Sequence, residues 1–252
     1  MSGKRIDMRT PDGVMDTYTF QPEGEGPWPA VIVYMDAFGV RPQLDEMAQR
    51  LASNGFFVAV PNLYYRSGPF APFNPKEVFT EGPEQKRFRS MIQSIDPTMI
   101  MRDTAAILDH LDSERCVRDG SMGAVGYCMG GGYAISALGT FPDRFAVGAS
   151  FHGASLATDK PDSPHLLAEK IRGRLYVGIA GIDPGFPPEQ RDRLEQALSA
   201  AGVDYTLEMY DGVKHGFAVT GHLVYDRDAS ERHWTTLVRM LNDTLWQQSI
   251  GV

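Results

Sequence analysis

The sequence predicts an α/β protein with a mostly parallel central sheet and helices on both faces of that sheet. Short, continuously apolar runs such as PAVIVYM (29–35) are typical of strands that are covered on both faces. Segments of helical length alternate with these runs, which is the order of a parallel sheet with crossover helices. A chain of 252 residues can bury one large core. We therefore expect a single α/β domain over residues 1–252.

The first elements in chain order form a strand–helix–strand unit. VMDTYTF (14–20) is the first predicted strand, and its polar and apolar residues partly alternate. PAVIVYM (29–35) and FFVAVP (56–61) are predicted buried strands, and the segment between them has the apolar spacing of one helix face. The residues with that spacing are Leu44, Met47, Ala48 and Leu51. Gly55 suits the end of this helix, so the three elements predict a parallel βαβ unit.

Residues 62–96 interrupt this rhythm. The segment is rich in Pro, Gly and aromatic residues and contains Arg66, Arg87 and Arg89. A loop of this length inside a compact domain usually lines a binding site or forms a lid. We expect an irregular active-site loop at about 62–96, with a poorly ordered surface excursion as the alternative.

Regular structure resumes at residue 96. Asp96 is a suitable N-cap and Pro97 a suitable first residue for the helix PTMIMRDTAAILDHL. The remaining predicted strands are 122–127, 145–151, 174–180 and 204–210. The remaining predicted helices follow Cys128 and span 187–202 and about 223–248. In such sheets, ligands bind beyond the carboxyl ends of the strands.

Composition limits the classes of partner. The net charge of −8 opposes binding to nucleic acid or to an anionic membrane, since both need a positive field. The amino terminus lacks the apolar core of a secretory signal. Two cysteines form a poor disulfide framework, which fits a reducing cytoplasm. We expect a cytoplasmic monomer or dimer that acts on a small molecule.

Chemically active side chains follow several of the predicted strands. Asp36, Cys128, His152, Asp183 and His215 each come directly after a strand or within a few residues of its end. Because the carboxyl ends of parallel strands meet at one edge of the sheet, these side chains should converge. The sequence therefore predicts an active site at this edge.

The segment GYCMGG (126–131) has the features of a nucleophile on a sharp strand-to-helix turn. Gly126 and Gly130 lie two residues either side of Cys128, where larger side chains would clash. Backbone N–H groups at the start of the next helix can hold a negatively charged oxygen, and the helix dipole favours the reactive thiolate. The order Cys128, Asp183, His215 is that of nucleophile, acid and base.

These residues also allow other interpretations. Asp204, Glu208 and Asp211 are the rivals of Asp183 as partner of His215. An inert core cysteine is the alternative for Cys128. GYCMGGG matches neither the GxGxxG nor the GxxxxGK[ST] phosphate loop, and no HExxH motif or close His pair occurs. We expect no metal and no cofactor.

The motifs MDAFGV, VPNLYYR, GYCMGG, GIDPGFPP and KHGFA, taken in chain order, resemble the dienelactone hydrolase family. The resemblance covers nearly the whole chain and implies the α/β-hydrolase fold with Cys128 as nucleophile, His215 as base and Asp183 as its partner. It also implies an oxyanion hole from the Met129 and Ala37 amides. It further implies that an acid at position 36 pairs with the thiol in the resting state.

Two positions depart from the family pattern. The family member that acts on dienelactone has Glu at the position of Asp36, and it has Arg where this chain has Val219. A lost charge-assisted contact to a substrate carboxylate is worth roughly 1.5–3 kcal/mol. Arg87 and Arg89 are the candidate replacements. The expected substrate-binding residues are Arg87, Arg89, Phe38, Tyr127 and His152, with a structural role as the alternative for His152.

These features predict a cysteine-dependent hydrolase of carboxylic esters, most naturally of enol lactones such as dienelactone or of other activated esters. The reaction would pass through a thioester acyl-enzyme. One alternative is a non-catalytic member of the fold that only binds a small ligand. Another is a related hydrolase of peptide or thioester substrates.

Overall fold

A computed structural model describes residues 3–246. Eight strands within this range form one sheet in the order β1-β2-β4-β3-β5-β6-β7-β8. The strands are β1 (Lys4–Thr10), β2 (Gly13–Phe20), β3 (Ala30–Tyr34), β4 (Phe57–Pro61), β5 (Met122–Tyr127), β6 (Phe145–Phe151), β7 (Arg174–Ile182) and β8 (Tyr205–Lys214). Strands β3 to β8 pair in parallel, whereas β2 pairs antiparallel with both β1 and β4. The mostly parallel sheet predicted from the sequence is confirmed.

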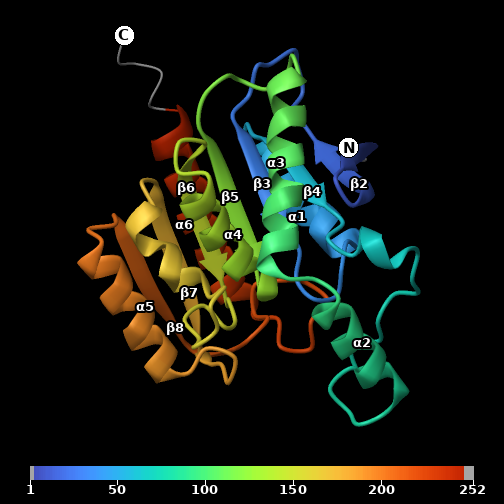
Figure 1. Ribbon diagram of the computed structural model, residues 1–252, viewed down its shortest axis with the longest axis vertical. Helices are drawn as coiled ribbons and strands as arrows, with labels where there is room; N and C mark the ends of the chain where they lie inside the picture. Colours follow the sequence, from blue (N-terminus) through green and yellow to red (C-terminus); the bar gives the residue numbers. More distant parts are fainter. Residues whose placement is uncertain (1–2, 247–252) are drawn as a thin grey trace.

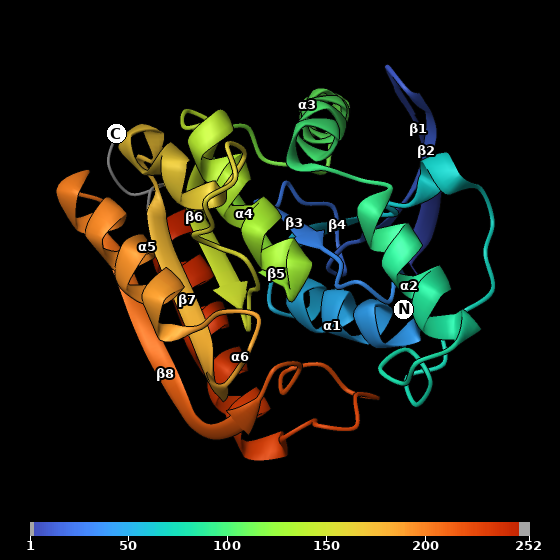
Figure 2. The same cartoon turned by 60° about the horizontal axis from the view of Figure 1, so that its bottom comes forward.

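Helices cover both faces of this sheet. The helices are α1 (Pro42–Ser53), α2 (Pro83–Gln93), α3 (Pro97–Ser113), α4 (Met129–Thr140), α5 (Pro188–Ala200) and α6 (Arg227–Leu241). Short helical turns occur at Tyr65–Ser67, Pro164–Lys170 and Asn242–Trp246. Helices α3, α4 and α5 lie on one face and α1 and α6 on the other (Figures 1 and 2). None of the helices within residues 3–246 is both long and apolar enough to span a membrane.

Local sequence features account for the elements that were predicted. The apolar runs of β3, β4 and β5 are buried at every position, as expected for strands covered on both faces. The predicted apolar face of α1 is buried against the sheet. At the start of α3, the Asp96 Oδ1 atom accepts the Met99 N–H at 2.8 Å, and Pro97 occupies the first turn.

Several elements differ from the prediction. Strand β1 was not predicted because it is an edge strand in which only Met8 is buried, so it lacks an apolar signal. Strand β8 continues to Lys214 rather than ending at 210. The closing helix starts at Arg227 rather than near 223, because the Asp226 side chain caps it by accepting the Ala229 N–H at 2.9 Å. Its predicted end at 247–248 lies outside the described residues.

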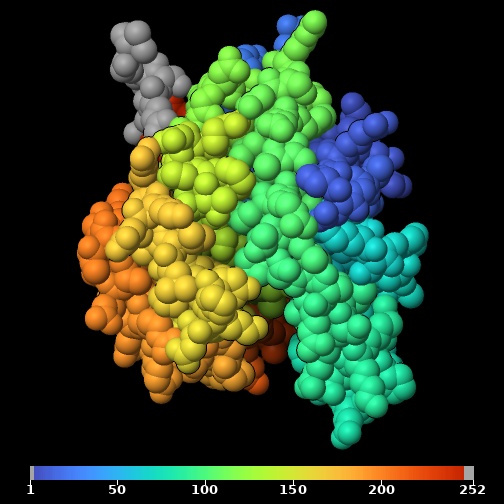
Figure 3. Space-filling view, viewed as in Figure 1, coloured from blue at the N-terminus to red at the C-terminus, as the bar shows by residue number. Residues whose placement is uncertain are grey.

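The segment at 62–96 contains helix α2 rather than irregular chain alone. Only Phe88 of α2 is buried, and this weak apolar pattern explains why the helix was not predicted. The Phe88 ring lies 5.1 Å from the ring of Phe38 and 5.0 Å from that of Phe73, measured between centroids. Helix α2 projects from the body of the molecule, and a hollow separates it from the segment that follows β6 (Figure 3). The segment is therefore docked by aromatic contacts at one side of a hollow surface.

Candidate active site

Cys128 occupies a strained turn between β5 and α4. Its backbone has φ 56° and ψ −122°, in a region that non-glycine residues rarely adopt. A Cβ atom at Gly126 would lie 1.9 Å from the carbonyl oxygen of Gly130, and one at Gly130 would lie 2.3 Å from that of Tyr34. These carbonyl oxygens belong to the backbone, so they cannot move aside as the end of a flexible side chain could. Both positions therefore require glycine, as the strand-to-helix turn predicted.

His215 and Asp183 come together beside Cys128. Asp183 follows β7 and His215 follows β8, and the Asp183 Oδ2 atom lies 2.7 Å from the His215 Nδ1 atom. The Asp183 carboxylate is 2% exposed, and its other oxygen accepts the Gly185 N–H at 2.8 Å. This second bond fixes the carboxylate, which in turn orients the imidazole ring.

The protonation of His215 reflects these two neighbours. Burial alone would lower its pKa, but the charge of Cys128 and side-chain hydrogen bonds with Asp183 and Cys128 raise the pKa of His215 to about 10. The ring is thus held as an imidazolium between a sulfur and a carboxylate. Such a pair can stabilise a thiolate and later supply or take up a proton.

The three acids that were alternatives to Asp183 as the partner of His215 do not contact its ring in the described part of the chain. The Asp204 side chain is 76% exposed and lies near Arg174. Glu208 accepts hydrogen bonds from Tyr176 and Arg232, and Asp211 is exposed on β8. Of these four candidate acids, Asp183 alone contacts the His215 ring in the described part of the chain.

The Ala37 and Met129 amides flank the turn from two chain segments. Residue 37 follows β3, which pairs with β5 so that Tyr34 lies opposite Gly126, and Met129 begins α4. Among residues 3–246, neither of these N–H groups donates to a protein acceptor. The Tyr64 hydroxyl donates to the Ala37 carbonyl oxygen at 3.1 Å and contacts the Met129 Sδ atom at 3.7 Å. Tyr64 was not singled out in the sequence, although it lies in the motif VPNLYYR.

Asp36 does not have the partner that the family resemblance implied. Arg41 donates from Nη1 to Oδ1 at 2.6 Å and from Nη2 to Oδ2 at 2.7 Å, and the His222 Nε2 atom lies 3.1 Å from Oδ2. Oδ1 also accepts the Phe38 N–H at 3.0 Å. Both oxygens are thus engaged by Arg41, His222 and the Phe38 N–H, and the described residues show no hydrogen bond between Asp36 and Cys128.

Charge explains why Asp36 tolerates its burial. The residue is 1% exposed, and burial alone would raise its pKa, but hydrogen bonds from His222 and Arg41 and the charge of Arg41 lower the pKa of Asp36 below its ordinary value. His222 lies in the loop after β8, far from Asp36 in the sequence, and the sequence pattern gave no sign of this contact.

Of the two arginines proposed as replacement anchors, Arg87 is engaged by protein groups and Arg89 is exposed. Arg87 donates to both oxygens of Glu84 and to the carbonyl oxygen of Ala71, and its guanidinium lies 4.1 Å from the centroid of the Phe73 ring. Arg89 is exposed on α2, which has its buried side at Phe88. These contacts hold Arg87 against other residues of the 62–96 segment.

Two further residues expected to bind substrate are buried. Tyr127 is 1% exposed, and its hydroxyl lies 2.9 Å from the His233 Nε2 atom, so it links β5 to α6. His152 is also 1% exposed, and its Nδ1 atom accepts the Cys128 N–H at 3.2 Å. Both side chains are thus almost completely buried and are engaged by protein groups, and a role for either in substrate binding stays a prediction.

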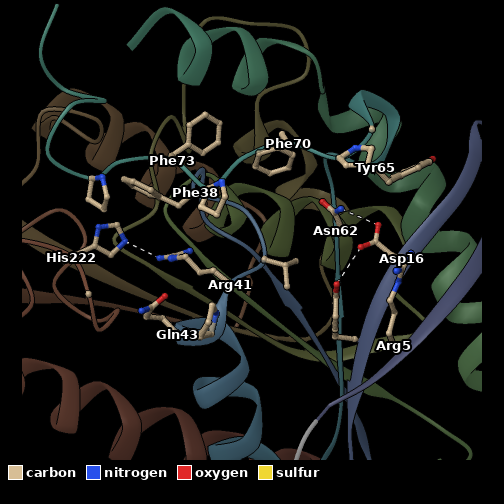
Figure 4. Close-up of a pocket in the computed structure, with 18 of the residues that line it drawn as sticks. Arg5, Asp16, Phe38, Arg41, Gln43, Asn62, Tyr65, Phe70, Phe73 and His222 are labelled. Atoms are coloured by element: carbon tan, nitrogen blue, oxygen red, sulfur yellow. Dashed lines mark hydrogen bonds between the residues drawn. The ribbon is translucent and has the colours of Figure 1, made fainter. Parts of the chain in front are cut away.

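Phe38 lines a cavity of about 670 Å³. Figure 4 shows this cavity with Arg41 and His222 on one side and Asn62 and Tyr65 on the other. The Phe38 ring lies edge-on to the His222 ring at 4.9 Å between centroids. Cys128 is not among the residues that line this cavity. No group of three or more potential metal ligands occurs within residues 3–246.

Comparisons with known proteins agree with this architecture. The chain is similar to a candidate carboxymethylenebutenolidase from Synechocystis sp., with 27% identity over 90% of this chain and 91% of the relative. It is also similar to Hydrolase tropI from Talaromyces stipitatus, with 28% identity over 83% and 78% of the two chains. A crystal structure of a candidate dienelactone hydrolase from Klebsiella pneumoniae superposes with a TM-score of 0.82, at 19% identity, over 94% of this chain and 97% of the other.

Most of the chain matches one protein family. The profile of the dienelactone hydrolase family matches residues 15–245, which include the Cys128 turn and the Asp183 and His215 loops. The eight-stranded sheet and the structural likeness to the Klebsiella protein give the same fold. The chain belongs to the dienelactone hydrolase family and is a carboxylic ester hydrolase of the α/β-hydrolase fold.

Proposed function

We propose that Cys128 is the nucleophile of this hydrolase, with His215 as acid and base and Asp183 as the residue that orients it. The observation that carries the proposal is the 2.7 Å contact between Asp183 and His215 together with the influence of Cys128 on the same imidazole. A strained turn that exposes the thiol beside two amide N–H groups without acceptors among residues 3–246 supports it.

The proposed reaction has two stages. The Cys128 thiolate attacks the ester carbonyl, and the Ala37 and Met129 amides stabilise the oxyanion. The His215 imidazolium then gives its proton to the leaving oxygen as the C–O bond breaks, leaving a thioester and a neutral imidazole. His215 next takes a proton from water, the hydroxyl attacks the thioester carbonyl, and the C–S bond breaks to release the acid and restore the thiolate.

The leaving group limits the substrates. A thiolate departs from a tetrahedral adduct more readily than a poor alkoxide or an amine, so adducts of amides and unactivated esters collapse backwards. Enol lactones such as dienelactone and other activated esters are therefore the proposed class. Because Val219 is fully buried and Arg87 is held by Glu84, we expect anionic and neutral activated esters to be taken with similar affinity.

The test uses p-nitrophenyl acetate, an enol lactone, a p-nitroanilide and an acyl thioester with the wild type, Cys128→Ala and Cys128→Ser. The proposal predicts multiple turnovers of the ester and lactone by the wild type, and loss of that turnover in both variants and after alkylation. A single stoichiometric labelling event without turnover would instead indicate a ligand-binding protein. Comparable rates on the anilide would refute the substrate class.

We also infer a reducing compartment, such as the cytoplasm, as the site of action. Cys116 and Cys128 are both free thiols. A nucleophilic thiol persists as such only where it stays reduced. We propose that the enzyme acts there as a monomer or dimer on small esters, without a nucleic acid or membrane partner.

A further inference from the structure

We propose that His152 is a positioning residue that holds the Cys128 turn in its reactive geometry by accepting the Cys128 backbone N–H. The inference rests on the proposed role of Cys128 as nucleophile. It assigns His152 a task in the site that differs from substrate binding and from proton transfer.

Hydrogen bonds tie the turn to the end of β6. The Cys128 N–H points to the His152 Nδ1 atom and to the Phe151 carbonyl oxygen, each at 3.2 Å. The Cys128 carbonyl oxygen accepts N–H groups from Gly131 at 3.1 Å and from Ala154 at 3.3 Å. The peptide groups on both sides of the nucleophile are thus held, and His152 supplies the only side chain among these contacts.

The backbone of His152 is itself held in an uncommon conformation. Its φ is 39°, in the left-handed region, and its N–H donates to the Gly178 carbonyl oxygen of β7 at 2.8 Å. The imidazole ring is enclosed by the rings of Tyr127, His215 and Phe217, at 5.9, 5.2 and 5.5 Å between centroids. Such strain persists where the surrounding structure enforces it, and it often marks functional sites.

The chemistry of the ring suits an acceptor. Burial lowers the pKa of His152 well below its ordinary value, and the charge of His215 lowers it further. The ring is therefore neutral, so one nitrogen carries a proton and the other accepts. Since Nδ1 accepts the Cys128 N–H, the proton is on Nε2. Nε2 is buried and has no hydrogen-bond partner within residues 3–246, so no contact there favours a proton on Nδ1 instead.

Loss of this acceptor would leave the Cys128 N–H with the Phe151 carbonyl oxygen alone. The thiol would then spend less time aligned with His215 and with the Met129 amide, which follows it directly in the chain. We expect kcat to fall about tenfold, the equivalent of one lost hydrogen bond, while KM stays within about twofold because His152 does not face the substrate.

The test compares three substitutions. His152→Asn places an amide oxygen where Nδ1 lies, and asparagine tolerates positive φ. His152→Gln places its amide nearer the position of Nε2, and His152→Ala has no acceptor. A matched control is His233→Asn, which removes another buried ring that bonds Tyr127 and the Ser230 carbonyl oxygen. The readouts are kcat and KM with p-nitrophenyl acetate, the rate of Cys128 alkylation by iodoacetamide against pH, and Tm.

The expected pattern is near wild-type behaviour for His152→Asn, with loss of kcat and an altered alkylation profile for His152→Gln and His152→Ala. His233→Asn should lower Tm without altering the alkylation profile. Wild-type kinetics in all three variants, or equal losses in all three that follow Tm as in the control, would overturn the inference. Nitrogen NMR of the wild type provides a test without substitution, because a charged ring or a proton on Nδ1 would also overturn it.

This design separates the inference from the proposed function. If Cys128→Ala hydrolyses esters as well as the wild type does, the proposed function is wrong. The alkylation profiles still measure how His152 affects the turn. If Cys128 is required but the His152 variants match the wild type, only the positioning role is wrong.

Discussion

Replacing Asp36 with asparagine should destabilise the protein strongly while leaving the thiol reactive. The carboxylate is 1% exposed, and the Arg41 side chain bound to it is 18% exposed. The asparagine would keep the size of the side chain but remove the counter-charge and one of the two acceptors of the Arg41 fork. Removing one partner of such a buried pair costs about 3–5 kcal/mol.

The loss can be measured by urea and thermal unfolding. For a chain of this size, about 2–4 °C of Tm accompanies each kcal/mol, so Asp36→Asn should lower Tm by about 6 °C or more. Arg41→Met should also destabilise, and the double variant should lose less than the sum of the two single losses. This non-additivity would identify the pair itself as the source.

The pH dependence has a defined sign. Because the folded pKa of Asp36 is lowered, its contribution is present above the unfolded value of about 3.9 and is lost as the pH falls through the folded value. The stability difference between wild type and Asp36→Asn should therefore narrow only in acid. A variant as stable as the wild type whose Cys128 is alkylated faster would refute the reasoning and favour the resting-state role implied by the family.

Three further outcomes are expected. Cys128→Ala should lower the pKa of His215 from about 10 in an NMR titration. The charged ring stabilises the fold fully below about pH 6.5, and this contribution is lost as the pH rises through about 10; it should be smaller in the variant. An unchanged titration would contradict the contact between His215 and Cys128. Gly130→Ala should lower the unfolding free energy by more than about 3 kcal/mol or prevent folding, and a native-like melting curve would argue against the tight turn. Arg87→Met should leave the ratio of KM values for an anionic lactone and a neutral ester within about twofold, whereas a selective rise for the anion would return Arg87 to the site.

The sequence predicted the elements whose signals are local. Buried strands such as β3 and β5 are read from continuous apolar runs, and the turn at Cys128 from its glycines. The edge strand β1 and helix α2 were missed because each buries only one residue and so has almost no apolar periodicity. Their stability comes from pairing and from aromatic contacts that the local pattern does not show.

Residues of the site were predictable where strand order alone brings them together. Asp183 and His215 end neighbouring parallel strands, so their contact follows from topology. The partners of Asp36 depend on the fold of loops: His222 lies 186 residues from Asp36 in sequence, and no rule of spacing joins them. The buried orientation of Tyr127 likewise depends on its hydrogen bond to α6, which the sequence of β5 does not show.

Because Asp36 is paired with Arg41, the charged group that interacts with the Cys128 thiol is His215 rather than Asp36. A free carboxylate beside Cys128 would oppose the thiolate, but here the charge of Asp36 is balanced by Arg41 within 2.6 Å. The remaining strong partner of the sulfur is the imidazolium of His215, which Asp183 holds in place. An Asp that is one methylene shorter than the Glu of the dienelactone-hydrolysing relative is thus part of a separate ion pair. The proposed nucleophile then needs no substrate-induced exchange of partners before it reacts.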